Sequence, residues 1–100
     1  MSHFQKRYAM IIRYFAMLRD ITHRSEQVWN KPAPTVHDLL GTLCNTYGSE
    51  FRKWLVDEHG NFGGLSIVLV NGVDCRELRG MHTPLKSSDV IAIFPPVAGG

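Results

Sequence analysis

The sequence predicts an α+β fold in which a mixed sheet of four to five strands curls around one main helix, with a second short helix after it. Two observations lead to this prediction. The elements read in the order strand, strand, helix, strand, short strand, strand. With 100 residues and 44% hydrophobic composition, the chain can bury one core but not two. We expect a flexible N-terminal extension over 1–8, one domain over 9–95 and an extended tail over 96–100.

The first half of the domain begins with two predicted strands. Residues 10–15 form a β-branched and aromatic run of strand length, and 16–24 read as a polar-rich connection. Residues 26–29 can return as the second strand. Pro32 and Pro34 then stop regular pairing, because proline lacks the amide donor that a sheet requires.

The main helix is predicted to begin at Thr35, whose hydroxyl can cap the first turn, with Asp38 three positions on as a weak capping-box acid. Apolar residues then recur every three or four positions and form one stripe: Val36, Leu39, Leu40, Leu43, Cys44 and Tyr47. Gly48 ends this helix. A second, shorter helical piece is expected over 50–58, finishing at Gly60.

The second half of the domain supplies the remaining strands. Residues 65–70 predict the third strand, and Asn71-Gly72 predicts a tight turn because both residues tolerate positive φ. A short paired strand follows over 73–76. An irregular segment and a turn occupy 79–89, and 90–94 form the last strand.

The end of the sequence carries the candidate chemistry. A strand that runs into a double proline cannot continue pairing, so the residues after it must leave the domain. The predicted tail consists of Pro95, Pro96, Val97, Ala98, Gly99 and Gly100. At about 3.3 Å per residue, its last four residues reach roughly 13 Å, and the two glycines leave the carboxylate without flanking side chains. Joined to AMP as an acyl adenylate, the Gly100 carboxyl group can accept sulfur. We therefore predict Gly100 as the reacting residue.

The segment from Phe94 to Gly100 resembles the C-terminal signature of the molybdopterin synthase small-subunit family, the MoaD-ThiS type of ubiquitin-like sulfur carrier. Tyr14 to Asp20 is similar to the end of that family's first strand and the segment after it. Further similar segments occur in the family's order: Val70-Asn71-Gly72, Pro84-Leu85 and Ser88-Asp89-Val90. The resemblance covers roughly residues 10–100 and implies a ubiquitin-like β-grasp fold.

The resemblance also implies partners. A ubiquitin-activating-type adenylyltransferase would adenylate Gly100 with Mg-ATP, and a sulfurtransferase would supply the sulfur of a thiocarboxylate. In the family, that thiocarboxylate enters the large subunit of molybdopterin synthase and donates sulfur to cyclic pyranopterin monophosphate in molybdenum cofactor biosynthesis. Catalytic side chains would belong to the partners, and no cofactor would be bound by this chain. The sequence departs from the family pattern in its N-terminal extension, at 61–64 and at 73–83.

The two faces of the predicted sheet have different roles. We expect one face to be buried against the main helix: Ile12, Tyr14, Val68, Val70, Ile91 and Ile93 against Leu39, Leu40 and Leu43. The alternate positions are apolar as well, with only Arg13 charged, and consist of Ile11, Phe15, Ile67, Leu69, Ala92 and Phe94. An apolar patch of this kind indicates a protein interface. We predict a docking surface centred on Phe15 and Phe94, unless the second helical piece or the N-terminal extension covers it.

Composition excludes several other functions. A formal net charge of +2 is too small for a nucleic-acid surface, and the longest apolar runs fall far short of the roughly 20 residues that span a bilayer. The N-terminal residues do not resemble a signal peptide, so we expect a cytoplasmic protein. The five histidines lack ligand spacing, and no metal site is expected. Cys44 is expected in the core. Arg76 and Arg79 would lower the pKa of Cys75, which makes this thiol a candidate persulfide carrier, secondary to the Gly100 tail.

The acceptor of the sulfur stays open at this point. The same carrier chemistry would serve a tungsten-pterin, thiazole, cysteine or tRNA thiolation pathway. A ubiquitin-like modifier would instead end in an isopeptide bond between Gly100 and a lysine, and a plain interaction module would use the tail for no covalent step.

Overall fold

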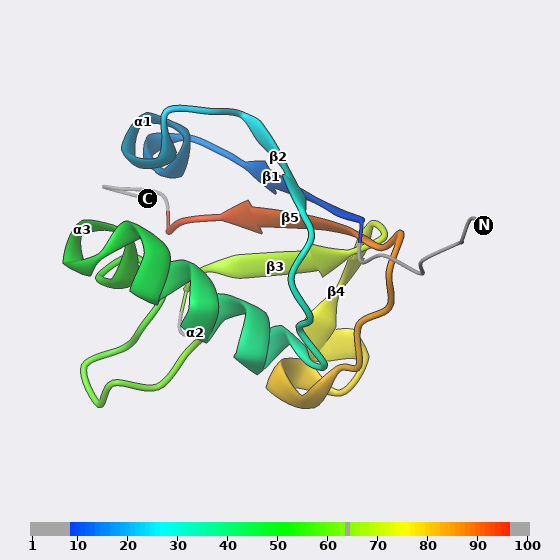
Figure 1. The fold of residues 1–100 in the computed structure, drawn as a ribbon. Helices are drawn as coiled ribbons and strands as arrows, with labels where there is room; N and C mark the ends of the chain where they lie inside the picture. The colour runs from blue at the N-terminus through cyan, green and yellow to red at the C-terminus, as the bar shows by residue number, and fades with distance from the viewer. Residues whose placement is uncertain (1–8, 64, 97–100) are drawn as a thin grey trace.

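The computed structural model describes residues 9–63 and 65–96, and these form one five-stranded mixed sheet with its helices packed on one face (Figure 1). The elements in chain order are β1 (Met10–Tyr14), α1 (Met17–Thr22), β2 (Glu26–Trp29), α2 (Val36–Tyr47), α3 (Ser49–Arg52), β3 (Ile67–Val70), β4 (Val73–Asp74), the 3-10 helices η1 (Cys75–Glu77) and η2 (Gly80–His82), and β5 (Val90–Phe94). The prediction of a mixed sheet with one main helix and a short second helix is confirmed.

The strand order is β2-β1-β5-β3-β4, which places the last strand of the sequence in the middle of the sheet. β5 pairs in parallel with β1 and antiparallel with β3. A parallel pair needs a long crossover connection, and here the chain between β1 and β5 includes α2. As a result, the chain leaves the sheet from its centre when it passes Phe94.

The predicted turn at Asn71-Gly72 is confirmed, since both residues have positive φ, 51° and 86°, and they join β3 to β4. Asn71 also fixes the start of β5. Its side-chain amide donates to Oδ1 of Asp89 at 2.9 Å, and its Oδ1 accepts the Val90 amide at 2.8 Å. Asp89 is itself buried and accepts the Lys86 amide with its other oxygen. This network holds the central strand at the end opposite to Phe94.

α2 begins and ends as predicted. The Thr35 hydroxyl accepts the backbone amide of Asp38 at 3.2 Å, which satisfies one of the free donors of the first turn. Gly48 follows the last residue of the helix with a φ of 88°. The stripe predicted for this helix is buried apart from Tyr47, which is half-buried.

One helix was missed, and the bounds of several predicted elements are wrong. The first strand ends at Tyr14 rather than at Phe15. The connection over 16–24 contains α1, because the buried side chains of Leu18 and Thr22 are spaced four apart and anchor one helical face to the core. α3 ends at Arg52 rather than near Glu58, since the chain then turns and bonds with its own return segment, as in Gly63 N–H to the Leu55 carbonyl at 3.0 Å.

The third strand starts at Ile67, two residues later than predicted, and the fourth covers only Val73–Asp74. The fourth strand is short because Asp74 caps a 3-10 turn: its carboxylate accepts the Arg76 amide at 2.9 Å and the backbone then winds over 75–77.

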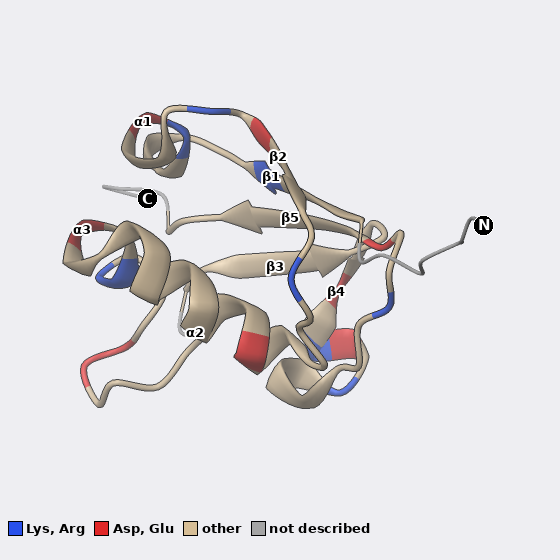
Figure 2. Ribbon diagram, in the orientation of Figure 1, with Lys and Arg blue, Asp and Glu red and all other residues tan. Residues whose placement is uncertain are grey.

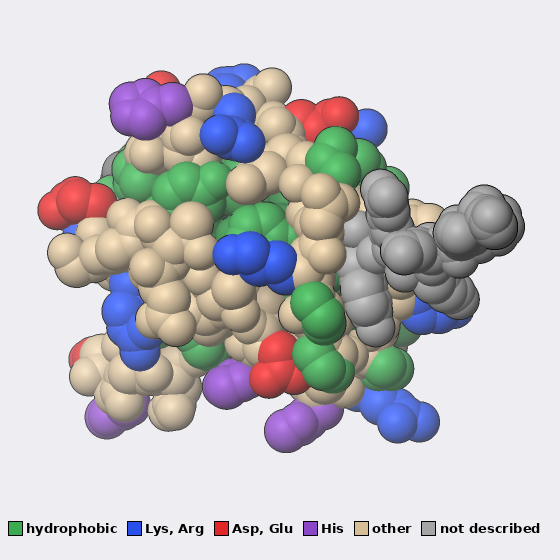
Figure 3. Space-filling model, viewed as in Figure 1, with side chains coloured by type: hydrophobic (Ala, Val, Ile, Leu, Met, Phe, Trp, Pro, Cys, Tyr) green, Lys and Arg blue, Asp and Glu red, His purple; other side chains and the backbone are tan. Residues whose placement is uncertain are grey.

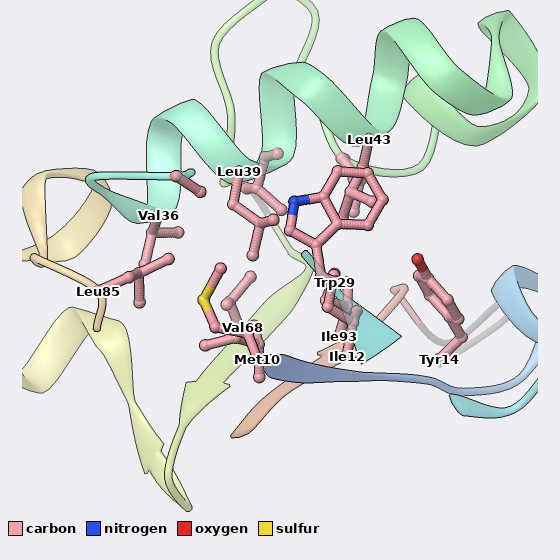
Figure 4. Close-up of a cluster of buried hydrophobic side chains, with 14 of the residues drawn as sticks. Met10, Ile12, Tyr14, Trp29, Val36, Leu39, Leu43, Val68, Leu85 and Ile93 are labelled. Atoms are coloured by element: carbon pink, nitrogen blue, oxygen red, sulfur yellow. The ribbon is translucent and has the colours of Figure 1, made fainter. Parts of the chain in front are cut away.

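The inner face of the sheet forms the core with α2, as predicted. Figure 4 shows Leu39 and Leu43 of α2 directed at Ile12, Val68 and Ile93 of the sheet. The predicted inner residues are all buried: Ile12, Tyr14, Val68, Val70, Ile91, Ile93, Leu39, Leu40 and Leu43. None of the helices in the described part of the chain is long and apolar enough to span a bilayer.

Candidate functional site

The centre of the candidate site is the point where the chain leaves β5. Pro95 is buried and Pro96 is half-buried, and neither can donate to a neighbouring strand. β5 ends at the same side of the molecule as α1 and α3 (Figure 1). Pro96 lines a small hollow with Lys53 and Trp54 of the α3 region. The other predicted tail residues, Val97, Ala98, Gly99 and the reacting residue Gly100, lie outside the described residues.

The predicted docking residues share the outer face of the sheet. Ile11, Phe15, Leu69, Ala92 and Phe94 are all half-buried. Leu69 and Ala92 are directly paired across β3 and β5. Phe15 and Phe94 stack with ring centroids 4.2 Å apart and an interplanar angle of 11°. The sheet therefore brings the five predicted residues to one side, and their role in docking stays a prediction.

The register divides this face into rows. Pairing places Ile67 next to Phe94, so the row nearest the chain exit is apolar and largely aromatic. The next row holds Arg13 and Ala92 beside each other. Arg13 donates to the Glu26 carboxylate at 3.2 Å on the neighbouring β2. The charged pair lies toward one edge, since β3 and β5 carry no charged residue (Figure 2).

The second helical piece does not cover the outer face. Phe51 of α3 is buried on the inner side, where its ring centroid lies 6.0 Å from that of Tyr14. Tyr47 of α2 packs against the same two rings. α3 thus extends the inner layer, and the N-terminal extension over 1–8 lies outside the described residues.

Two further apolar side chains were missed by the sequence prediction. Val28 is 56% exposed and is paired with Ile11, which places it on the outer face. Leu65 is 80% exposed and lines the same hollow as Pro96. Strict alternation from the buried Trp29 would have indicated that Val28 faces outward, once the pairing of β1 with β2 was fixed. Alternation with Ile67 and Leu69 would likewise have marked Leu65 as outward-facing, although the observed strand begins only at Ile67.

The lowered pKa expected for Cys75, on which the persulfide hypothesis depends, is wrong. The thiol is buried, and burial followed by the nearby Asp74 carboxylate raises its pKa. Arg76 opposes this shift, but its guanidinium is bound to Asp74 at 2.7 Å, so its charge is offset. Cys44 is a core residue as predicted, and burial raises its pKa as well. A buried thiol with a raised pKa is a poor nucleophile.

Within residues 9–63 and 65–96, no three His, Cys, Asp or Glu side chains lie close enough together to hold a metal ion.

Comparison with known proteins agrees with this arrangement. The model of the ThiS family matches residues 12–100. Small archaeal modifier protein 3 of Haloferax volcanii is 33% identical over 90 residues, which cover 89% of this chain and 96% of that protein. The solution structure of the Haloferax volcanii HVO 2177 protein is similar with a TM-score of 0.80 at 30% identity, covering 100% of this chain and 93% of that one. The predicted ubiquitin-like β-grasp fold is confirmed by this similarity and by the sheet topology.

A chain in the crystal structure of the Amycolatopsis orientalis BexX/CysO complex is also similar, with a TM-score of 0.73 at 25% identity. The match covers 92% of this chain and 100% of that one. This solved neighbour is thus found together with another protein.

Proposed function

The chain belongs to the ThiS family of ubiquitin-like sulfur carriers and modifiers, and from that premise we propose that it carries sulfur on the carboxyl group of Gly100. The carboxylate would be adenylated by a ubiquitin-activating-type enzyme that uses Mg-ATP. Hydrosulfide, released from the persulfide of a sulfurtransferase by a thiol reductant, would then attack the acyl carbon, so that a C–S bond forms, the C–O bond to AMP breaks and AMP leaves. The product is a thiocarboxylate.

One observation carries the proposal: the central strand of the sheet ends at Phe94 and is followed at once by two prolines, four residues before Gly100. The chain cannot go on pairing there, because proline has no amide donor. An exit from the middle of a rigid sheet holds the start of the tail in a fixed position, and the paired glycines leave the reacting carboxyl group accessible to a narrow active site.

For the acceptor, we propose the pterin precursor of the molybdenum cofactor, with this chain as the small, non-catalytic subunit of a molybdopterin synthase. The resemblance of the tail segment to that family favours this acceptor. The outer apolar face would bind the large subunit, since Phe15 and Phe94 lie beside the chain exit and would bring the partner's active site near Gly100. We place the reaction in the cytoplasm, where the free Cys44 and Cys75 would stay reduced.

A second candidate function is supported by the name of a relative. The similar protein of Haloferax volcanii is named a small archaeal modifier, and a modifier would join Gly100 to a lysine by an isopeptide bond. Both functions require the same adenylate, so they differ only in the nucleophile that displaces AMP.

Intact-mass measurement separates these functions. The full chain is incubated with its activating enzyme, Mg-ATP and a sulfur source. A mass gain equal to the exchange of one oxygen for sulfur supports the carrier, and a ladder of high-mass conjugates supports the modifier. An unchanged mass with an activating enzyme that is competent on another carrier would rule out both.

Deletion of Gly100 is the matched variant for this experiment. We expect complete loss of adenylation with an unchanged thermal unfolding midpoint, because the residue supplies the reacting group and the hydrophobic core of the described residues is formed between Met10 and Ile93. Release of pyrophosphate at the wild-type rate by the shortened chain would refute the assignment of Gly100.

For the acceptor, a large synthase subunit is mixed with the thiocarboxylated chain and the pterin precursor. Formation of the dithiolene product supports the pterin pathway. A stable thiocarboxylate that fails to transfer to this acceptor would redirect the proposal to another pathway.

A further inference from the structure

A concave site that the proposed function does not use lies between α2 and the loop after α3. The hollow has a volume of about 420 Å³, within the range of small-molecule sites. It is lined by His37, Gly41, Asn45, Arg52, Gly60, Asn61, Phe62 and Met81. The three residues from α2 are four positions apart, so they form one stripe along the helix. This stripe and the loop belong to the helical layer and not to the outer face of the sheet (Figure 1).

The loop that forms the outer wall is held in place by its own hydrogen bonds. The Asp57 amide donates to the Asn61 carbonyl at 2.8 Å, and Val56 forms an antiparallel bridge with Phe62. The Asp57 carboxylate accepts the amides of His59 and Asn61 at 2.8 and 2.9 Å. These bonds lower the pKa of Asp57, so at neutral pH the carboxylate is charged and is bound to the two loop amides. The wall is therefore preformed.

Arg52 is the charged residue in the lining of the hollow, and it lies there with the polar side chains of His37, Asn45 and Asn61. Arg52 lies with its guanidinium carbon 5.8 Å from the Phe62 ring centroid, and the His37 ring meets the same ring edge-on at 5.1 Å. Arg52 takes part in no salt bridge and no side-chain hydrogen bond within the described residues. None of the described residues that line the hollow carries a carboxylate.

The acidic groups near Arg52 along the chain are engaged elsewhere, and Asp38, next to His37, accepts the Thr35 hydroxyl at 2.9 Å. Asp57 binds the loop amides, Glu58 lies 3.6 Å from His59, and Glu50 pairs with Lys53 at 3.1 Å. In the space-filling view, basic, histidine and acidic side chains are interspersed on this side of the molecule (Figure 3). The positive charge of Arg52 is thus left available to a ligand.

Gly41 marks the floor of the hollow. A glycine inside a helix is unfavourable relative to alanine, and here a Cβ atom would meet no other heavy atom within 4 Å. Packing in this chain therefore does not require the glycine. Its effect is to leave the helix backbone open to the hollow, beside the partly buried side chains of Phe62 and Met81.

We propose that this hollow binds a small organic anion, with its carboxylate or phosphate group on Arg52, His37 and the two asparagine amides and its apolar body against Gly41, Phe62 and Met81. The site is independent of the Gly100 chemistry. It gives the protein a metabolite-binding function in addition to carrying sulfur.

The test is a titration followed by ¹⁵N NMR on the full chain. The probes are phenyl phosphate, benzoate, inorganic phosphate and neutral benzamide. We expect phenyl phosphate or benzoate to shift the Gly41 amide, the side-chain amides of Asn45 and Asn61 and the Arg52 Nε signal in a saturable way. Whichever of these two probes binds with the higher affinity shows whether the site prefers a phosphate or a carboxylate. Inorganic phosphate is expected to bind more weakly, since it lacks the apolar body, and benzamide weakest of all.

Two variants and a control decide the outcome. Arg52→Gln should weaken the best anion by at least about fivefold, because the charge-assisted hydrogen bond is lost. Gly41→Leu should weaken it by filling the floor while the helix is retained. Lys53→Gln, which removes the neighbouring charge that lines the hollow beside Pro96 instead of this one, should leave affinity unchanged.

Three results would overturn the proposal: shifts confined to the Phe15 and Phe94 face, equal affinity in the wild type and Arg52→Gln, or an absence of saturable shifts with all four probes. Activation of Gly100 is unaffected in either case, so this test and that of the proposed function fail separately.

Discussion

The two faces of the sheet are built from the same residue types in the same strands, yet they do different things. On the inner face, Ile93 is fully buried beneath α2. On the outer face, Ile67 remains 37% exposed. It lies on the neighbouring strand β3 and precedes Val68, the inner-face residue that is paired with Ile93. Burial of an aliphatic side chain contributes about 1.5–3 kcal/mol, so most of the stability comes from the inner face. Apolar residues on the outer face add less to folding and are available to a partner.

The largest expected effect comes from comparing the two isoleucines. Ile93→Ala should lower the free energy of unfolding by about 3 kcal/mol, since it removes buried methylene groups and leaves a cavity. Ile67→Ala, which makes the same chemical change on the outer face, should cost less than about 1 kcal/mol. Urea unfolding measures both. Equal losses would mean that the outer face is also part of the folding core.

Next in size is the effect of a charge on the outer face. Phe94→Arg should weaken binding to the proposed large subunit by more than about tenfold, because a charge would replace the centre of an apolar contact. The free energy of unfolding should change by less than about 1 kcal/mol, given that Phe94 is only half-buried. Titration calorimetry with the partner tests the first statement. An unchanged Kd, also for Phe15→Arg, would remove the docking surface.

On the inner face, pH gives a smaller effect that isolates one buried group. Tyr14 is 1% exposed, and its hydroxyl donates to the Gln27 side-chain oxygen at 2.6 Å, which also accepts from Tyr47 at 2.7 Å. Burial, followed by the neighbouring Tyr47, raises the pKa of the Tyr14 phenol above its ordinary value of about 10. The unfolded state therefore loses this proton at a lower pH than the folded state does.

The stability contributed by Tyr14 is present below pH 10 and is lost as the pH rises above it. The expected slope is about 1.4 kcal/mol per pH unit for this one proton. Tyr14→Phe should remove that slope, and the comparison with wild type at pH 8–11 by urea unfolding is the measurement. An identical alkaline loss in both proteins would show that other groups cause it.

The smallest effect defines the edge of the outer patch. Val28→Thr should change the free energy of unfolding by less than about 0.5 kcal/mol, because the side chain is 56% exposed and threonine keeps the strand propensity. A measurable loss of partner affinity would extend the docking surface from Ile11 to β2. Affinity equal to wild type would confine the surface to the rows that contain Phe94 and Leu69.

Local sequence signals predicted most of the helices and strands, but they did not predict which strands pair with one another. The helix beginning at Thr35 and the turn at Asn71-Gly72 were correct, because capping and positive φ are properties of a few adjacent residues. The helix over 17–22 was missed, since its six residues carry only one and a half turns of periodicity and it depends on Leu18 reaching the core.

The sequence by itself determined the alternation that makes the strands two-sided, the apolar stripe of α2, and the proline pair that ends β5 before Gly100. The tertiary structure alone decided that β5 lies between β1 and β3, that Val28 joins the outer face, and that α2 and a loop enclose a hollow beside Arg52. Backbone geometry and turn chemistry act over a few residues. Strand neighbours and enclosed surfaces depend on contacts between segments far apart in the chain, which local patterns do not encode.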